Sequence, residues 1–300
     1  MPARTWRPPY ALDVATVLGP LRRGAGDPAY RQDASGVLWL TANTPAGAGT
    51  VVLHRQDREV EANAWGEGAE WLLDGLPALL GADDNVDEFR AHHPLIEQTW
   101  RRMPGLRLGA TGRVWDALLP AVLEQKVTGH EARRSYRDLC RRFGAPAPGP
   151  APEGMRVPPT PRALLSINDW EWHEAGVDGA RRRALIACAQ VAHRLGRAAE
   201  LRGEQGRRLL RLVPGIGIWT AAEVAQRAWG DPDAVSVGDF HIPSIVGWAL
   251  VGHPLDDDGM LEVLAPYAPQ RHRAVRYIEA SGFRKPRFGP RLSPRDHRAI

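Results

Sequence analysis

The chain has 300 residues, of which 43% are hydrophobic and 25% are charged, and its formal net charge is +4. This composition is typical of a folded globular chain and excludes one that is mainly disordered, and no stretch approaches the roughly 18 uncharged apolar residues of a membrane helix. The two cysteines, Cys140 and Cys188, are too few for a four-thiolate iron–sulfur cluster or a Cys₄ zinc site, and we expect a reducing, cytoplasmic location.

Residues 1–89 predict an acidic α+β domain, an antiparallel sheet with helices. The segments 37–42 and 50–55 are rich in β-branched and aromatic residues and are joined by a Gly/Pro-rich turn, which is typical of paired strands. Apolar and polar residues alternate over 60–64, so we expect a third strand with one solvated face. A helix is predicted at 68–80, perturbed by the proline within it. We find no catalytic constellation here and expect a supporting role.

The strand signals end after residue 89, and a mainly helical, two-lobed core is predicted over 90–283. Apolar residues recur at helical spacing in 113–128, where Pro120 predicts a late start or a kink. The segment 131–143 has one apolar face and carries arginines on the others. Residues 90–143 hold 11 basic and 5 acidic groups. A basic block on a nearly neutral chain is compatible with a polyanionic partner, but from charge alone a solvated helix face is the commoner explanation.

Two proline-containing segments interrupt or follow this helical core. Residues 144–161 contain seven prolines and predict an extended connector. Helical spacing then returns and continues to about residue 281. The last residues, 284–300, are basic and proline-rich, and we expect a C-terminal tail or a strap over the helices.

The segment 208–228 (RLLRLVPGIGIWTAAEVAQRA) predicts two helices joined by a tight turn. Gly215 and Gly217 allow the backbone to approach another surface closely. The second helix, with Thr220 in its first turn, begins with unpaired N–H groups and the positive end of its dipole, which together suit a phosphate oxygen. Such a contact positions a protein on a nucleic-acid backbone without reading its sequence. An ordinary helix–helix turn also uses glycine and proline, so the turn alone leaves both interpretations open.

The surroundings of this turn resemble the helix-hairpin-helix superfamily of DNA glycosylases, in which a Gly/Pro-rich loop and an aspartate follow the hairpin. The matching residues are Leu212, Pro214, Gly215, Gly217, Thr220, Ala221 and Asp239. The likeness covers about residues 5–283, with the hairpin at about 204–229, and is greatest to the 3-methyladenine DNA glycosylase II type. It includes Glu124-Gln125, the Pro-Thr-Pro at 159–161 and Trp219.

Asp239 is the predicted catalytic residue. It follows a loop and precedes an apolar run, so capping of a helix N-terminus is the commonest explanation for it in isolation. Behind a phosphate-binding hairpin, its carboxylate would lie near a bound deoxyribose. There it could stabilise the oxocarbenium-like sugar left by a departing base and orient or deprotonate the attacking water.

Trp219 and Glu223 are the residues that we expect to shape the pocket for the flipped base. An indole attracts a cationic alkylated base, although core packing is an equal alternative for Trp219. The lyase members of the superfamily have a nucleophilic lysine where this chain has Trp219, so the resemblance implies a hydrolase without strand scission. Glu223 stands where the methyladenine enzymes have an aromatic residue. Its carboxylate either faces a cationic base or lies exposed on the helix.

The remaining predicted site residues contact DNA or an ion. Gln125 and Lys126 occupy the place of the residues that probe the duplex, and Lys126 replaces an apolar wedge. We interpret His241 as structural or phosphate-facing. The resemblance also implies a monovalent cation, Na⁺ or K⁺, held by hairpin backbone carbonyls. These are the carbonyls of Arg211, Val213 and Ile216.

We therefore predict a monofunctional glycosylase that removes alkylated purines, of the 3-methyladenine and 7-methylguanine type, from double-stranded DNA in base excision repair. We expect a monomeric, cytoplasmic, nucleoid-associated bacterial protein without a required cofactor or an iron–sulfur cluster. Two alternatives remain. One is a glycosylase for a neutral or bulky lesion, and the other is a non-catalytic DNA-binding protein, because the same hairpin also serves as a plain backbone clamp.

Overall fold

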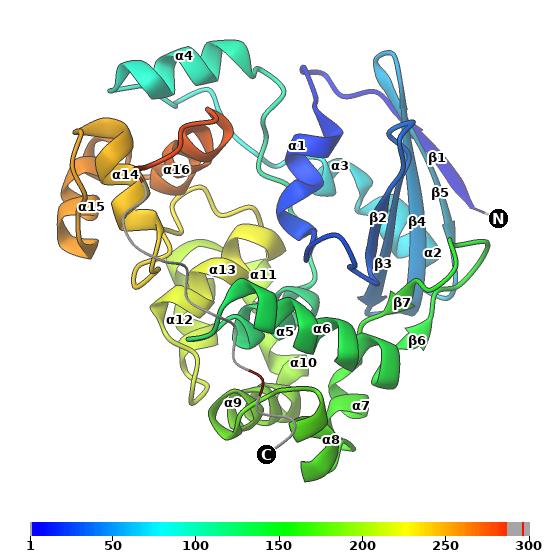
Figure 1. The fold of residues 1–300 in the computed structure, drawn as a ribbon. Coiled ribbons are helices and arrows are strands. Elements are labelled where there is room, and N and C mark those ends of the chain that lie inside the picture. The colour runs from blue at the N-terminus through cyan, green and yellow to red at the C-terminus, as the bar shows by residue number, and fades with distance from the viewer. Residues whose placement is uncertain (1, 287–295, 297–300) are drawn as a thin grey trace.

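The N-terminal region of the protein is an antiparallel sheet with short helices packed against it, as predicted (Figure 1). The computed structural model describes residues 2–286 and residue 296. The sheet has the order β1-β5-β4-β3-β2. Its strands are β1 (Ala3–Trp6), β2 (Tyr30–Gln32), β3 (Leu38–Thr44), β4 (Gly47–Gln56) and β5 (Glu59–Trp65). In β5 every second side chain is buried, so the alternation in the sequence gives the sheet one apolar face.

Four short helical segments cover that face or follow it. They are α1 (Val14–Leu18), the 3₁₀ turn η1 (Gly19–Leu21), α2 (Ala69–Asp74) and α3 (Leu76–Leu79). The single helix predicted at 68–80 is thus two helices, because Gly75 ends the first and Pro77 lies in the opening turn of the second. Leucines from α1, α2 and α3 pack with the sheet in one apolar cluster.

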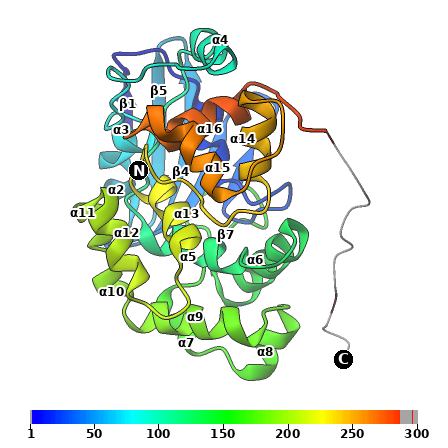
Figure 2. The same ribbon diagram turned by 90° about the vertical axis from the view of Figure 1, so that its left-hand side faces the viewer.

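The rest of the described chain is mainly helical and forms two further apolar clusters. One lobe is built around α5 (Val114–Leu123), with α6 (Gly129–Phe143), α7 (Pro161–Leu165), α8 (Asp169–Glu174), α9 (Gly179–Gln190), α10 (Ala192–Leu195), α11 (Ala198–Leu201), α12 (Gly203–Arg211) and α13 (Ile218–Ala228). The other contains α4 (Pro94–Arg102), α14 (Ile242–Leu250), α15 (Asp257–Leu264), the 3₁₀ turn η2 (Ala265–Tyr267) and α16 (Arg271–Ala280). Figure 2 shows α14–α16 at one end, α7–α9 at the other and α13 between them. The predicted two-lobed helical core is confirmed.

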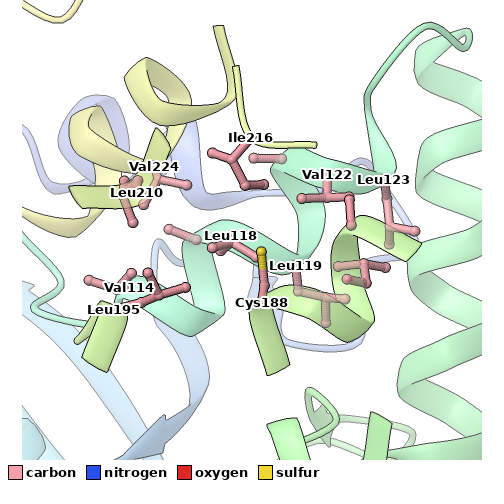
Figure 3. Packing of buried hydrophobic residues seen from close by; sticks show 14 of the residues in the cluster. Val114, Leu118, Leu119, Val122, Leu123, Cys188, Leu195, Leu210, Ile216 and Val224 are labelled. Atoms are coloured by element: carbon pink, nitrogen blue, oxygen red, sulfur yellow. The ribbon is translucent and has the colours of Figure 1, made fainter. Parts of the chain in front are cut away.

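The helix α5 is the centre of the larger lobe. Every residue from Ala117 to Leu123 is buried, so the second half of the helix is apolar on all sides rather than on one stripe. Pro120 lies inside this run and is itself buried. Figure 3 shows Leu118 and Val122 of α5 meeting Ile216, which comes from the turn between α12 and α13. The turn is therefore anchored in the core of this lobe.

The proline-rich segment 144–161 is a connector that packs against β3 and β4 of the N-terminal sheet. It contains the two-stranded ladder β6 (Ala145–Pro146) and β7 (Arg156–Val157). The Arg156 N–H donates to the Pro28 carbonyl at 2.8 Å. The Thr41 hydroxyl of β3 donates to the Arg156 carbonyl at 2.6 Å. These bonds tie the larger helical lobe to the sheet.

A buried ion pair ties the smaller lobe to the end of the N-terminal region. Arg273 of α16 donates to both carboxylate oxygens of Asp84, and the two side chains are 0% and 2% exposed. Removing one partner of such a pair would leave an uncompensated buried charge. The pair therefore fixes α16 against the segment that follows α3. Among the described residues no helix is both long and apolar enough to cross a bilayer. Most of the tail predicted at 284–300 lies outside the described residues.

Candidate active site

The turn between α12 and α13 packs against the core of the larger lobe on one side and is accessible to solvent on the other. Gly215 has a φ of +90°, and a Cβ there would lie 2.7 Å from the Cβ of Ala184 in α9. Ile216 is buried in the core of the larger lobe. At Gly217, in contrast, no atom beyond its neighbours in the chain lies within 4 Å of the place where a Cβ would stand. The unpaired N–H groups at the start of α13 therefore lie at an accessible surface, where an anion can bind them.

Gln125 connects the end of α5 to this turn. Its Nε2 donates to the Gly215 carbonyl at 3.0 Å and to the Thr220 hydroxyl at 2.8 Å. The Thr220 side chain is only 2% exposed, so it faces Gln125 and leaves the backbone of its helical turn to the outer surface. The sequence did not indicate this bond between two predicted DNA-contacting residues.

Lys126 follows Gln125 with a φ of +54° and an exposed side chain. A left-handed conformation is uncommon for a residue with a Cβ. Here the neighbours hold it in place, because the next helix begins immediately with a capping box of Thr128 and Glu131. The loop therefore presents a cation beside the hairpin and outside the pocket described below.

Asp239 lies in the loop between α13 and α14, and three donors fix its carboxylate. Oδ1 accepts from the backbone N–H groups of His241 at 2.7 Å and Ile242 at 2.9 Å. Oδ2 accepts from the indole Nε1 of Trp219 at 3.0 Å. Asp239 therefore caps the start of α14 from two residues before the N-cap residue, His241, and also meets α13. Its side chain is half-buried and lines a pocket, so the carboxylate is held rigidly without being sealed in the core.

The pocket has a volume of about 320 Å³. We call its two sides the apolar wall and the polar wall. The apolar wall comes from α1, η1 and α3 and consists of Val17, Leu18, Pro20, Leu21 and Leu79. The polar wall comes from α13, the loop after it and α16 and consists of Glu223, Gln226, Arg227, Ser236, His272, Arg276 and Glu279. Asp239 and Ile242 lie beside the polar wall, and Arg107, Leu108, Gly109, Thr111 and Val275 also line the pocket. The N-terminal domain thus forms part of the site and does not merely support it.

Glu223 faces the pocket, but its carboxylate is already engaged. Oε2 pairs with Arg227 Nη1 at 2.8 Å, and Oε1 accepts from the Ser236 hydroxyl at 2.6 Å. Gln226 donates to Ser236 at 2.9 Å and continues this network. Burial acts to lower the pKa of Arg227, but the carboxylates of Glu223 and Glu124 outweigh it and raise the pKa above its ordinary value. The charge of Glu223 is therefore balanced by a firmly protonated arginine.

His272 is the buried titratable residue of the polar wall that the sequence did not single out. It lies on α16 and is 7% exposed. Burial, followed by the nearby charges of Arg276, Arg227 and Arg273, lowers its pKa well below the ordinary value. The imidazole is therefore uncharged near neutral pH. A single histidine on an amphipathic helix carries no signal that would have identified it.

The predicted site residues separate into three places. Asp239 and Glu223 line the pocket, and Trp219 lies behind Asp239 rather than among the lining residues. Gln125, Gly215 and Thr220 meet at the hairpin, beside Gly217. Lys126 and His241 are exposed and do not line the pocket. His241 packs its ring edge-on against Phe240, which is 80% exposed.

The proposed cation ligands lie along the turn of the hairpin. The Val213 carbonyl accepts from the Ile216 N–H at 3.1 Å and retains its second lone pair. Carbonyl oxygens are hard, uncharged donors, so this donor set is compatible with a monovalent cation. Among the described residues no group of three or more His, Cys, Asp or Glu could hold a metal. Cys140 and Cys188 are buried, and burial raises the pKa of the Cys188 thiol to about 12.

Solved DNA glycosylases share this fold over nearly the whole chain. A 3-methyladenine DNA glycosylase from Archaeoglobus fulgidus is 17% identical with a TM-score of 0.74, covering 92% of this chain and 96% of its own. An 8-oxoguanine glycosylase/lyase from Clostridium acetobutylicum is 12% identical with a TM-score of 0.69, covering 94% and 97%. MBOgg1, in complex with a low-affinity DNA ligand, is 13% identical with a TM-score of 0.73, covering 93% and 95%. No protein-family model and no curated protein matches the sequence.

Proposed function

We propose that this chain, which has the fold of the DNA glycosylases, is a monofunctional DNA glycosylase acting in base excision repair. Its substrates would be alkylated purines of the 3-methyladenine and 7-methylguanine type in double-stranded DNA. The observation that carries the proposal is the placement of Asp239. This carboxylate lies at a 320 Å³ pocket and follows a hairpin whose N–H groups face outward. Solved structures of the same fold include a 3-methyladenine glycosylase and a DNA complex.

The hairpin would bind the DNA backbone. The N–H groups around Gly217 and the positive end of the α13 dipole suit a phosphate oxygen. Gln125 keeps the turn in this conformation through its bond to Gly215, and the exposed Lys126 adds a positive charge beside it. A monovalent cation on the carbonyls of Arg211, Val213 and Ile216 would supply one further charge for phosphate. None of these contacts selects a base, so they position the duplex.

Asp239 would act on the sugar of a nucleotide whose base has been flipped into the pocket. As the C1′–N bond breaks, the base leaves with the electron pair, and the sugar acquires oxocarbenium character. The carboxylate stabilises this charge, and the three donors that fix it lower the reorganisation needed during reaction. Water then adds to C1′, and its proton passes by way of Asp239 to solvent. A base that is already cationic needs no separate general acid.

The lysine content of the chain supports hydrolysis without strand scission. The sequence has two lysines, Lys126 and Lys285, and neither lines the pocket. A lyase would need an amine at the sugar to form a Schiff base. The indole of Trp219 occupies the place beside Asp239 and donates a hydrogen bond to it.

A neutral base is the second candidate substrate, and the Glu223–Arg227 pair favours it. A free carboxylate in the pocket would attract a cationic base, whereas this one is neutralised by an arginine at 2.8 Å. Parallel assays with 7-methylguanine and with a neutral lesion such as hypoxanthine distinguish the two candidates.

Replacement of Asp239 by asparagine tests the proposed chemistry. The asparagine oxygen can still accept from the N–H groups of His241 and Ile242, so the cap of α14 is preserved while the charge is removed. Base release from methylated DNA, identified by mass, should fall by about 10²- to 10³-fold under single-turnover conditions. Binding to the duplex should remain within about twofold of the original.

The matched control for this variant is Asp258→Asn, which removes an exposed carboxylate from α15. Its base release should equal that of the unmodified protein. Equal release by the Asp239→Asn variant would show that Asp239 is a cap only. A protein that binds DNA but releases no base, with or without Asp239, would be a non-catalytic backbone clamp.

A further inference from the structure

The face of α16 that lines the pocket carries a buried histidine, His272, whose ring has no hydrogen-bond partner among the described residues. His272, Val275, Arg276 and Glu279 are spaced at i, i+3, i+4 and i+7 on α16, and all four line the pocket. Among the described residues His272 makes no hydrogen bond, although it is only 7% exposed. Its ring nitrogens are not sealed in the core and are accessible from the pocket. A ligand in this pocket is the natural partner.

The protonation state of His272 defines what it offers to that partner. Burial and the surrounding arginines lower its pKa well below the ordinary value, so the ring is neutral. A neutral imidazole carries one N–H donor and one nitrogen acceptor. It can therefore hydrogen-bond with the edge of a base without repelling a base that is cationic.

The other polar groups around His272 are mainly donors. Both oxygens of Glu223 are engaged by Arg227 and Ser236, and the Gln226 amide is engaged by Ser236. One guanidinium nitrogen of Arg276 donates a hydrogen bond to the exposed Glu279, and the other N–H groups of Arg276 can bind a ligand. A base that enters the pocket therefore meets guanidinium and imidazole donors and, on the same helix face, the carboxylate of Glu279.

The apolar wall faces this edge from the other side of the pocket. Val17, Leu18 and Leu21 present aliphatic surface. This surface can pack on the flat face of a purine, but its side chains cannot hydrogen-bond with the polar groups on the edge of the base. The discriminating contacts must therefore come from the polar wall. Such contacts are selective, because a base that lacks the matching group leaves a buried polar atom unpaired.

We propose that His272 is the specificity-determining residue of the pocket and that, together with Arg276, it selects purines that carry an oxygen at C6 over purines that carry an amino group there. The 6-oxygen accepts from these donors, and the adjacent ring N–H of a 6-oxopurine can donate to the imidazole or to a carboxylate. This inference rests on the proposed glycosylase function and specifies its substrate class.

The test compares two bases of equal charge. DNA treated with a methylating agent contains 7-methylguanine, a 6-oxopurine, and 3-methyladenine, a 6-aminopurine, and both are cations. Release of the two bases is measured in one reaction by mass spectrometry, with rates taken under single-turnover conditions. The replacement His272→Leu should lower 7-methylguanine release about 10- to 100-fold and change 3-methyladenine release less than threefold. An oligonucleotide with hypoxanthine, a neutral 6-oxopurine, should follow 7-methylguanine.

Two further variants keep the test decisive. His272→Gln restores a donor and an acceptor and should recover at least a third of the 7-methylguanine rate, even if the leucine variant melts at a lower temperature. His193→Leu, at an exposed histidine of α10, should leave both rates unchanged. Equal losses for both bases in a folded His272→Leu variant would overturn the inference and leave the glycosylase intact. Release of neither base by the unmodified protein would instead overturn the proposed function itself.

Discussion

The polar and apolar walls of the pocket are held in different ways, although they enclose the same space. In the polar wall Glu223, Arg227 and Ser236 are joined by hydrogen bonds, and Asp239 beside them is fixed by three donors. The apolar wall presents aliphatic side chains from the N-terminal domain, and one side-chain bond among the described residues links it to the polar wall, from Arg227 Nε to the Pro20 carbonyl at 3.2 Å. Directional bonds fix orientation, whereas packing supplies surface and excludes water. Changes in the polar wall should therefore alter rates and selectivity, and changes in the apolar wall should alter affinity.

The largest effect among variants that change the setting of the proposed catalytic carboxylate without removing it is expected for Trp219→Phe. Phenylalanine fills most of the space of the indole but cannot donate to Asp239 Oδ2, which then keeps only the backbone donors on its other oxygen. A hydrogen bond to a charged group is worth about 1.5–3 kcal/mol. We expect kcat for base release to fall at least tenfold and KM to change less than twofold, because the residue positions the carboxylate and does not bind DNA.

The control for this variant is Trp170→Phe, at an indole of α8 that is 64% exposed. Its kcat and KM should not change. A Trp219→Phe variant with raised KM and unaltered kcat would mean that the indole contacts the base directly, which would move Trp219 from a positioning role into the pocket.

The sequence motif was enough to single out the hairpin and the pocket residues next to it, which lie close together along the chain. The turn at Gly215, the helix that follows it and the carboxylate of Asp239 are about 25 residues apart at most, and their spacing is a property of one motif. The direction of their side chains was not predictable. Trp219 presents its N–H to Asp239, and Thr220 turns inward to Gln125, because packing and not spacing sets these orientations.

The apolar wall could not be predicted, for a different reason. Leu18 and Leu21 reach the pocket from a point about 200 residues before α13 in the sequence, and a short apolar helix looks the same whether it faces a core or a site. The strands at 37–42 and 50–55 and the mainly helical core were predicted because they depend on local periodicity. The docking of the connector at Arg156 to the sheet depends on backbone bonds between distant segments, which leave no trace in composition.

The neutrality of His272 gives the polar wall a measurable pH dependence of stability. Its pKa is lowered in the folded protein and returns to about 6.5 on unfolding. As the pH falls below 6.5, the unfolded chain takes up a proton that the folded chain does not, so the free energy of unfolding decreases by at most about 1.4 kcal/mol per pH unit. Above pH 6.5 this contribution is constant.

Chemical denaturation of the unmodified protein and of His272→Gln between pH 5 and 8 measures this contribution. The difference between the two free energies of unfolding should be flat above pH 6.5 and should shift against the unmodified protein below it. His193→Gln, at an exposed histidine, should give a curve parallel to that of the unmodified protein throughout. Parallel curves for His272→Gln as well would show that the folded protein protonates His272 as readily as the unfolded chain does.

The smallest effect is expected in the apolar wall, for Leu21→Ala. Leu21 is partly buried and lines the pocket, so its truncation removes aliphatic surface from beside the base without opening a cavity in the sheet core. Because a buried methylene contributes about 0.8 kcal/mol, partial loss of this contact should raise KM for base release about three- to fivefold. The value of kcat should stay within twofold, since Asp239 lies beside the polar wall and its donors belong to α13 and the start of α14. Leu165→Ala, at a leucine of α7 that is 46% exposed, should change neither constant. A fall in kcat with unaltered KM for Leu21→Ala would mean that the N-terminal domain helps to orient the sugar. It would contradict the assignment of rate to the polar wall and affinity to the apolar wall.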